Sequence, residues 1–245
     1  MTKEQLYKKF AKYYDKIYEK MDYQKEAEFI KWAVKIYKNS PGNELLDVAC
    51  GTGGHAQFLK EDFKITGFDI SDEMLEIARK KYPDIPFING DMKKLDLDSK
   101  FDVLICMFSA INYNTTLEEL KITLSNFYNH LKEGGVLVFD MGLNKENWVE
   151  GIVSVDTVVD KNFKLARIWQ SHLEEDVFNS SFVFLVKEDG KLDFDIDEHK
   201  LGVFGMEDTV NLLKKIGFEI FISSEFKDEE WHLGTGERPV FVGVK

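Results

Sequence analysis

The chain has 245 residues, enough for one large α/β domain with an insertion, and its 44 acidic and 32 basic side chains give a net charge of −12. No cluster of lysine or arginine offsets this charge, so we expect a small-molecule partner and neither nucleic acid nor a membrane surface. Without a signal-like or membrane-long apolar run we expect a cytoplasmic protein, and two cysteines, Cys50 and Cys106, are too few for a disulfide scaffold or a four-cysteine metal site.

The first forty residues predict a helical region. Apolar side chains recur at helical spacing in residues 3–38, with Leu6, Phe10 and Ile17 on one face of a first helix and a second helix following it. The Ser-Pro-Gly-Asn segment at 40–43 ends this region.

Between residues 45 and 142, apolar runs typical of buried strands alternate with helical patterns. The expected helices cover about 54–59, 71–82 and 117–131, and Ser71 is the expected N-cap of the second. Such alternation indicates a parallel sheet that is covered on both faces, with its ligand beyond the carboxyl ends of the strands. The predicted strands are LLDVAC, KITGFDI, PFINGD, FDVLICMF and GVLVFDMG.

The pattern changes to a period of two from about residue 150 to 204. This predicts an antiparallel insertion of three or four strands, with a hairpin turn at residues 188–191. A helix over 206–216, capped by Gly217, and the strands FEIFISSEF and PVFVGVK then complete the core, the last strand antiparallel at the sheet edge. The predicted fold class is α/β, a doubly wound seven-stranded and mostly parallel sheet with an inserted antiparallel β appendage.

A glycine cluster follows the first predicted strand. Gly51, Gly53 and Ala56 fit the pattern G-x-G-x-x-A, which here follows a strand and opens a helix. Glycine allows a sharp turn and lets a ligand approach main-chain N–H groups. A tight turn without a ligand is the alternative interpretation.

Three carboxylates favour a particular ligand for this loop. Asp69 ends the second strand, where an acid can accept both hydroxyls of an adenosine ribose, and Asp91 follows the third strand, where it can accept from the adenine amine. Asp47 lies just before the glycines and would repel the pyrophosphate of a dinucleotide. An adenosine ligand that carries an ammonium and a sulfonium instead of phosphates fits all these features, and S-adenosylmethionine is such a ligand.

The motifs DVACGTGGH, FDISDEML, NGDM and LKEGGVL resemble those of class I S-adenosylmethionine-dependent methyltransferases. VACGTG, GDM, MFSAINY and RPVFVGV are also similar to bacterial N,N-dimethyltransferases of nucleotide-linked amino sugars. The resemblance implies a helical lid at residues 1–40, a Rossmann-like S-adenosylmethionine-binding domain at 41–149 and 205–245, and an antiparallel insertion at 150–204. The cofactor-binding residues that it implies are Tyr14, Asp47, Ala49, Gly51, Gly53, Asp69, Ile70, Met74, Asp91, Met92 and Met107.

Methyl transfer from a sulfonium needs positioning and a neutral nucleophile, and no metal. Tyr18 from the lid and Tyr113 after the fourth strand are the candidates to orient an acceptor nitrogen, and His199 is the best placed of the histidines to face the acceptor. We expect His55 to flank the cofactor and His130 to lie at the surface.

The resulting prediction is N-methylation of a small amine such as an amino sugar or an amino acid-like metabolite. An NAD-dependent oxidoreductase is opposed by Asp47, and a tRNA methyltransferase by the acidic balance. A non-catalytic protein that binds S-adenosylmethionine remains an alternative. The β insertion has two interpretations, a wall of the acceptor pocket or an interface between subunits, as in similar amino-sugar enzymes. Apolar alternation in IVSVDTVV and FVFLV is consistent with a homodimer.

Overall fold

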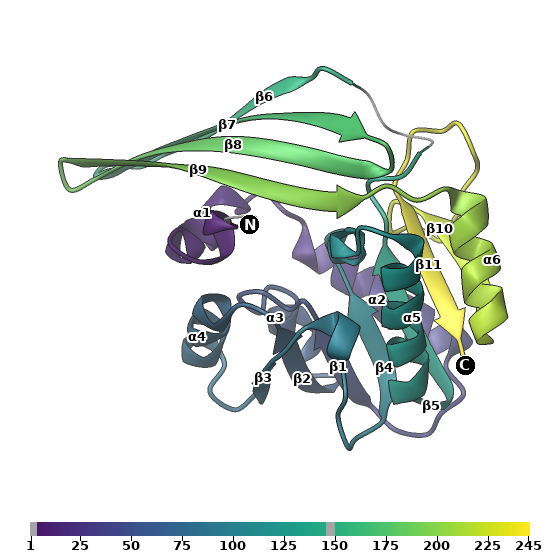
Figure 1. Cartoon of the computed structure of the whole chain (residues 1–245). Helices are drawn as coiled ribbons and strands as arrows, with labels where there is room; N and C mark the ends of the chain where they lie inside the picture. Colours follow the sequence, from purple (N-terminus) through teal and green to yellow (C-terminus); the bar gives the residue numbers. More distant parts are fainter. Residues whose placement is uncertain (1–3, 146–149) are drawn as a thin grey trace.

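The computed structural model describes residues 4–145 and 150–245, and it contains a central seven-stranded sheet beside a separate four-stranded antiparallel sheet (Figure 1). The central strands are β1 (Glu44–Val48), β2 (Lys64–Asp69), β3 (Phe87–Asn89), β4 (Phe101–Cys106), β5 (Leu131–Asp140), β10 (Glu219–Ser224) and β11 (Pro239–Val244).

The strand order is β10-β11-β5-β4-β1-β2-β3, and all neighbours are parallel except the two that pair with β11. The predicted doubly wound and mostly parallel sheet is thus confirmed. The last strand is antiparallel as predicted, but its expected place at the sheet edge is wrong, because β10 lies outside it. Five of the six residues of β11 are buried, whereas β10 is mostly half-exposed, so the more apolar strand takes the inner position.

Helices cover both faces of the central sheet. The helices are α2 (Tyr23–Tyr37), α3 (Ala56–Leu59), α4 (Asp72–Lys81), α5 (Leu117–His130) and α6 (Met206–Ile216). Successive strand residues point to opposite faces, so Leu45 packs with α2 and α3 while Leu46 packs with α5 and α6. Ser71 caps α4 by accepting a hydrogen bond from the Met74 N–H, and Gly217 ends α6 at φ 122°, both as predicted.

The N-terminal segment is less regular than predicted. The expected first helix is broken into two 3₁₀ turns, η1 (Gln5–Tyr7) and η2 (Ala11–Tyr13), followed by the short helix α1 (Tyr14–Ile17). The carboxylate of Asp197, far away in the chain, accepts hydrogen bonds from the N–H groups of Gln5 and Leu6, both at 2.7 Å. Contacts with a distant strand therefore replace the helical pattern that the local sequence favours.

The four-stranded sheet consists of β6 (Val153–Val159), β7 (Phe163–Glu174), β8 (Val177–Glu188) and β9 (Lys191–Gly202) in sequential order. Its hairpin turn has positive φ at Asp189 and Gly190, as the predicted two-residue turn requires. One face packs on the N-terminal segment, where Phe10 contacts Phe184 with ring centroids 4.8 Å apart. In Figure 1 the segment around α1 accordingly lies between this sheet and α4.

His130 is buried, not at the surface as expected, because its Nε2 accepts from the Leu97 N–H and its Nδ1 bonds the Asn126 carbonyl. Cys50 and Cys106 are buried free thiols.

The domain boundaries stay a prediction. The boundary at 149 and the first residues of the lid lie outside the described residues, and α2 packs on the core sheet. Within the described residues, no helix is long and apolar enough to cross a membrane.

Candidate active site

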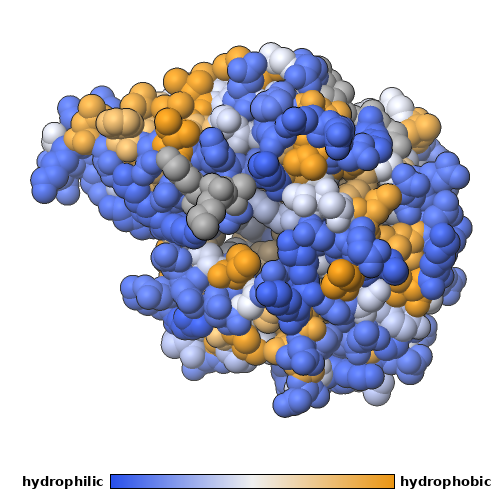
Figure 2. All heavy atoms as spheres, viewed as in Figure 1, coloured by the Kyte–Doolittle hydropathy of each residue, from blue (hydrophilic) through white to orange (hydrophobic). Residues whose placement is uncertain are grey.

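A cavity of about 200 Å³ lies at the carboxyl ends of β1, β2 and β4, under the N-terminal segment. A second, smaller cavity of about 30 Å³ adjoins it and shares Tyr14, Gly51 and Met107 in its wall. Figure 2 shows the surface hollowed between the antiparallel sheet and the central sheet. The fold thus provides a crevice where a doubly wound sheet is expected to bind its ligand.

The loop after β1 turns sharply around residues with positive φ. Ala49 has φ 58°, Gly51 φ 55° and Gly53 φ 77°, so the backbone takes a conformation that costs side-chain-bearing residues energy. Gly51 lines the cavity, and a Cβ there would meet the Met74 side chain at 3.3 Å. Gly53 instead faces the ring of Tyr82 and is absent from the cavity wall. Glycine therefore serves the backbone conformation of the loop at this position, and not contact with a ligand.

The Asp69 carboxylate bridges the glycine loop after β1 and the N-terminus of α4. One of its carboxylate oxygens accepts from the Gly51 N–H and the other from the Ser71 N–H, each at 2.8 Å. Burial raises the pKa of Asp69, and the hydrogen bonds from Ser71 and Gly51 partly oppose this effect. The carboxylate therefore lines the cavity with oxygen atoms that keep lone pairs for a ligand.

Asp47 is buried behind the glycine loop, with 3% of its surface exposed. None of the described residues donates a hydrogen bond to its carboxylate, and burial raises its pKa to about 7, against the opposing influence of His55. A buried carboxylate without donors is costly unless a partner arrives from outside the chain. This is the place where a positively charged ligand group would find an unsatisfied acceptor.

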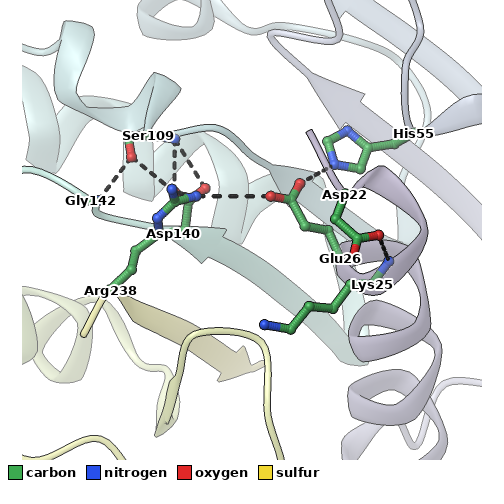
Figure 3. A network of polar contacts seen from close by, with 8 residues as sticks. All are labelled: Asp22, Lys25, Glu26, His55, Ser109, Asp140, Gly142 and Arg238. Atoms are coloured by element: carbon green, nitrogen blue, oxygen red, sulfur yellow. Dashed lines mark hydrogen bonds and ion pairs between the residues drawn. The ribbon is translucent and has the colours of Figure 1, made fainter. Parts of the chain in front are cut away.

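A polar network continues from this point along the carboxyl edge of the sheet (Figure 3). His55 Nε2 lies 2.7 Å from Glu26 Oε2, and Arg238 bridges Glu26 at 3.9 Å and Asp140 at 3.4 Å. Asp140 in turn accepts from the N–H and hydroxyl of Ser109. Burial alone would lower the pKa of His55, but the carboxylates of Glu26, Asp47 and Asp140 together outweigh it and raise the value.

This network was not predicted as a unit, because its residues come from five separated segments. Asp140 did carry a signal that the sequence interpretation left unused, since it ends an apolar strand just as Asp69 does. Arg238 is neutralised by two acids, so it offers less positive charge to an anionic ligand than a free arginine would.

The predicted aromatic residues lie close together. The rings of Tyr14 and Tyr18 pack against each other with centroids 4.7 Å apart and planes tilted by 55°, and Tyr18 contacts Phe108 at 5.0 Å. The Tyr18 hydroxyl accepts a hydrogen bond from Arg167 at 2.9 Å. Tyr14 lines the cavity, whereas Tyr18 lies one layer further from it, toward the inner face of β7.

Tyr113 and His199 are joined by a hydrogen bond of 2.7 Å between the phenol oxygen and Nδ1. Tyr113 lines the cavity, and His199 is buried behind it on β9. Tyr7, which was not predicted, also lines the cavity, and its hydroxyl lies 2.7 Å from that of Tyr113. The helical pattern did not indicate Tyr7, because Tyr7 lies off the apolar face of the expected first helix.

The structure brings most of the predicted site residues into one cavity wall. Asp47, Gly53, Tyr18 and His199 are the predicted residues that lie outside that wall. Cavity-lining residues that the sequence interpretation missed include Glu4, Tyr7, Phe68, Lys93 and Phe108. The predicted residues that line it are Tyr14, Ala49, Gly51, Asp69, Ile70, Met74, Asp91, Met92, Met107 and Tyr113.

Comparison with known proteins gives consistent matches over nearly the whole chain. The sequence profile of a methyltransferase domain matches residues 45–135. The dTDP-3-amino-3,4,6-trideoxy-alpha-D-glucopyranose N,N-dimethyltransferase of Streptomyces venezuelae is 33% identical over 227 residues, which cover 91% of each chain.

Solved structures agree with this match. The crystal structure of Streptomyces venezuelae DesVI superposes with a TM-score of 0.82 at 30% identity, covering 96% of this chain and 98% of the other. CalS10, an amino pentose methyltransferase from Micromonospora echinaspora solved with S-adenosylmethionine bound, gives a TM-score of 0.79 at 26% identity and covers 96% of both chains. Sequence, fold and cavity therefore agree, and the chain belongs to the class I S-adenosylmethionine-dependent methyltransferases.

Proposed function

We propose that this methyltransferase transfers the methyl group of S-adenosylmethionine to the amino nitrogen of a small molecule, such as an amino sugar or an amino acid-like metabolite. The observation that carries the proposal is the full-length similarity to an enzyme named for N,N-dimethylation of an amino sugar. The net charge of −12 supports a small acceptor over tRNA, and donor and acceptor of this kind are metabolites of the cytoplasm, where we propose that the protein acts.

The cavity suits this donor. Asp47, which is buried just outside the cavity wall and accepts no hydrogen bond from the described residues, would accept from the ammonium of the methionine part. Asp69 would accept from the ribose hydroxyls. Asp91 and Met92, which line the cavity beyond Asp69, would hold adenine. When bound, S-adenosylmethionine supplies a methyl group on a sulfonium, which is a good leaving group.

The chain's own part in the reaction is to hold the acceptor nitrogen and to keep water away. Tyr18 has a fixed orientation, because Arg167 donates to its hydroxyl and Phe108 packs against its ring. Tyr113 presents its hydroxyl to the cavity with His199 behind it. We assign Tyr113 to orienting the acceptor from the cavity wall, and His199 to receiving a proton. Tyr18 would orient the acceptor through Tyr14 and Phe108, which line the cavity and pack against its ring.

The test is the release of S-adenosylhomocysteine by the purified protein with a panel of small amines, including dTDP-linked 3-amino sugars. We expect turnover with at least one amine of the panel and none with unmodified tRNA. Tight binding of S-adenosylmethionine without turnover on any amine would favour the non-catalytic alternative. Turnover on tRNA alone would overturn the small-molecule assignment.

We also propose that two copies associate through the outer face of the antiparallel sheet. Val155, Ile168, Val183 and Ile196 are register neighbours and form one apolar row across all four strands, each between 39% and 61% exposed. Leu185 and Phe194 extend it in the next row. Apolar residues are visible along this sheet at the upper left of Figure 2.

A second copy is the occupant that this face fits best. Strands β7, β8 and β9 have 12 residues each, so the four-stranded face measures about 40 Å by about 19 Å, or about 750 Å². A standard interface buries about 800 Å² on each partner. A row that crosses the centre of the face can also pack on itself around a two-fold axis.

Sedimentation tests the association. We expect a dimer at micromolar concentration for the wild-type protein and a monomer for Val183→Glu, because a charge in the middle of the row would be buried without a partner. Ile122→Glu on α5, at a position that is 42% exposed, is the matched control and should remain a dimer. A wild-type protein that sediments only as a monomer would refute the proposal.

A further inference from the structure

Behind the cavity, four side chains form one continuous hydrogen-bonded chain. The Tyr7 and Tyr113 hydroxyls lie 2.7 Å apart, Tyr113 lies 2.7 Å from His199 Nδ1, and His199 Nε2 lies 3.0 Å from Asp197 Oδ2. His199 and Asp197 are buried, with 4% and 0% of their surface exposed. The chain thus runs from the cavity wall into the protein interior.

Asp197 fixes the direction of this chain. Its carboxylate also accepts from the N–H groups of Gln5 and Leu6, at 2.7 Å each, and from that of Glu198 at 2.9 Å. Although burial raises the pKa of Asp197, the hydrogen bond and the charge of His199 and the hydrogen bonds from the Leu6 and Gln5 N–H groups outweigh it and lower the value. An ionised Asp197 has no proton to give, so Nε2 of His199 must carry one.

The donors and acceptors of the other hydrogen bonds follow from the proton on Nε2 of His199. In neutral His199 the lone pair is then on Nδ1, so Tyr113 donates to it, and the Tyr113 oxygen in turn accepts from the Tyr7 hydroxyl. Burial raises the pKa of both phenols well above the usual value, so neither holds a negative charge at neutral pH. At the cavity end, the Tyr7 hydroxyl oxygen keeps lone pairs, and no other described residue donates a hydrogen bond to it.

We propose that Tyr7, Tyr113, His199 and Asp197 form a proton relay that deprotonates the acceptor ammonium before methyl transfer. The inference rests on the proposed N-methylation, because an amine at neutral pH is mostly protonated and has no lone pair for attack. The ammonium gives its proton to the Tyr7 oxygen, Tyr7 gives its own to Tyr113, and Tyr113 gives its own to Nδ1 of His199. The neutral amine then forms the new N–C bond as the C–S bond breaks.

The charges balance at each end of the relay. The ammonium becomes an amine, and His199 becomes an imidazolium beside the Asp197 carboxylate, which stabilises it. The proton returns to solvent through the same two hydroxyls after the product leaves. The titratable groups that face His199 are Asp197 from β9, Tyr113 from η4 (Ala110–Tyr113) and Tyr7 from η1, and Phe182 from β8 closes the remaining side at 5.1 Å. Two acids line the cavity at the other end of the relay, Glu4 near Tyr113 and Asp69 near Tyr7.

A pH profile separates this relay from a merely structural role. At about pH 7, we expect His199→Gln and Tyr113→Phe each to lower kcat about 100-fold on the best amine of the panel. At about pH 9.5, where much of the acceptor is already neutral, the deficit should shrink to less than about threefold. The affinity for S-adenosylhomocysteine should stay within about twofold of the wild-type value, since these residues act on the acceptor.

Tyr13→Phe is the matched control, because Tyr13 belongs to the same segment but its hydroxyl bonds Glu188 outside the cavity. It should retain the wild-type profile. An equal deficit for His199→Gln or Tyr113→Phe at both pH values, or no deficit, overturns the relay while the wild-type enzyme still methylates amines. Absence of any wild-type turnover would instead count against the proposed function.

A second measurement needs no acceptor. Nitrogen-15 NMR of the wild-type protein should show the proton of the His199 ring on Nε2 and a hydrogen-bonded Nδ1, and Tyr113→Phe should shift the Nδ1 resonance alone. The opposite tautomer, with the proton on Nδ1, would contradict the direction of the relay.

Discussion

Replacing Asp47 with asparagine is expected to stabilise the cofactor-free protein while it weakens binding of S-adenosylmethionine. The pKa of Asp47 is raised from 3.8 to about 7 by burial, so keeping this carboxylate ionised in the folded state costs up to roughly 4 kcal/mol at pH 8. Asparagine removes that cost, and it also removes the negative charge that would face the donor's ammonium. Binding should weaken about 30- to 100-fold.

The sign of the pH dependence follows from the raised pKa. Between about pH 4 and pH 7 the unfolded state has lost the Asp47 proton while the folded state retains it, so the free energy of unfolding falls as the pH rises. In Asp47→Asn this part of the decline should vanish, as denaturant titrations across that range will show. Asp98→Asn, at an exposed aspartate, is the control and should follow the wild type. Equal stability of Asp47→Asn and wild type at pH 8 would contradict a buried, unpaired carboxylate.

Asp69→Ala should lose most of the affinity for the donor. The carboxylate holds both the Gly51 and the Ser71 N–H groups, so its removal releases the glycine loop and takes away the acceptor for the ribose hydroxyls. Hydrogen bonds to charged groups contribute about 1.5–3 kcal/mol each, so we expect calorimetry to show an affinity lower by about 100-fold or more.

Asp69→Asn keeps the size of the side chain but puts an N–H₂ group where two acceptors are needed, and it should lose affinity to a similar extent. Asp84→Ala, at an exposed acid, should bind as the wild type does. If Asp69→Ala kept wild-type affinity, the ribose would have to bind elsewhere in the cavity.

The parts of the site that depend on strand ends could be predicted from the sequence. Parallel strands bring their carboxyl ends to one edge, so Asp69 at the end of β2 and Asp91 after β3 could be placed beside the glycine loop from spacing alone. Gly51 followed from the same argument. Each of these residues can be recognised from its place at the end of a strand, and the topology of the doubly wound sheet puts these strand ends at the ligand-binding edge.

Contacts between distant segments could not be predicted in this way. The helical pattern of residues 3–17 does not indicate that Asp197, more than 190 residues away, accepts hydrogen bonds from the N–H groups of Gln5 and Leu6. These bonds hold the segment from which Tyr7 lines the cavity. The bridge from Glu26 through Arg238 to Asp140 likewise joins three segments that have no common motif. Periodicity reports which face of an element is apolar, and not which distant polar group will meet it.

The central claim is that an acidic, glycine-lined crevice holds a cationic methyl donor against a small amine. It is tested most directly by incubating the protein with S-adenosylmethionine carrying a carbon-13 methyl group and each amine of the panel, and by following the label with NMR. We predict that the labelled methyl group appears on nitrogen of at least one amine and that Asp47→Asn slows its appearance. Label that stays on the donor with every amine, or that appears only on oxygen, would contradict the account.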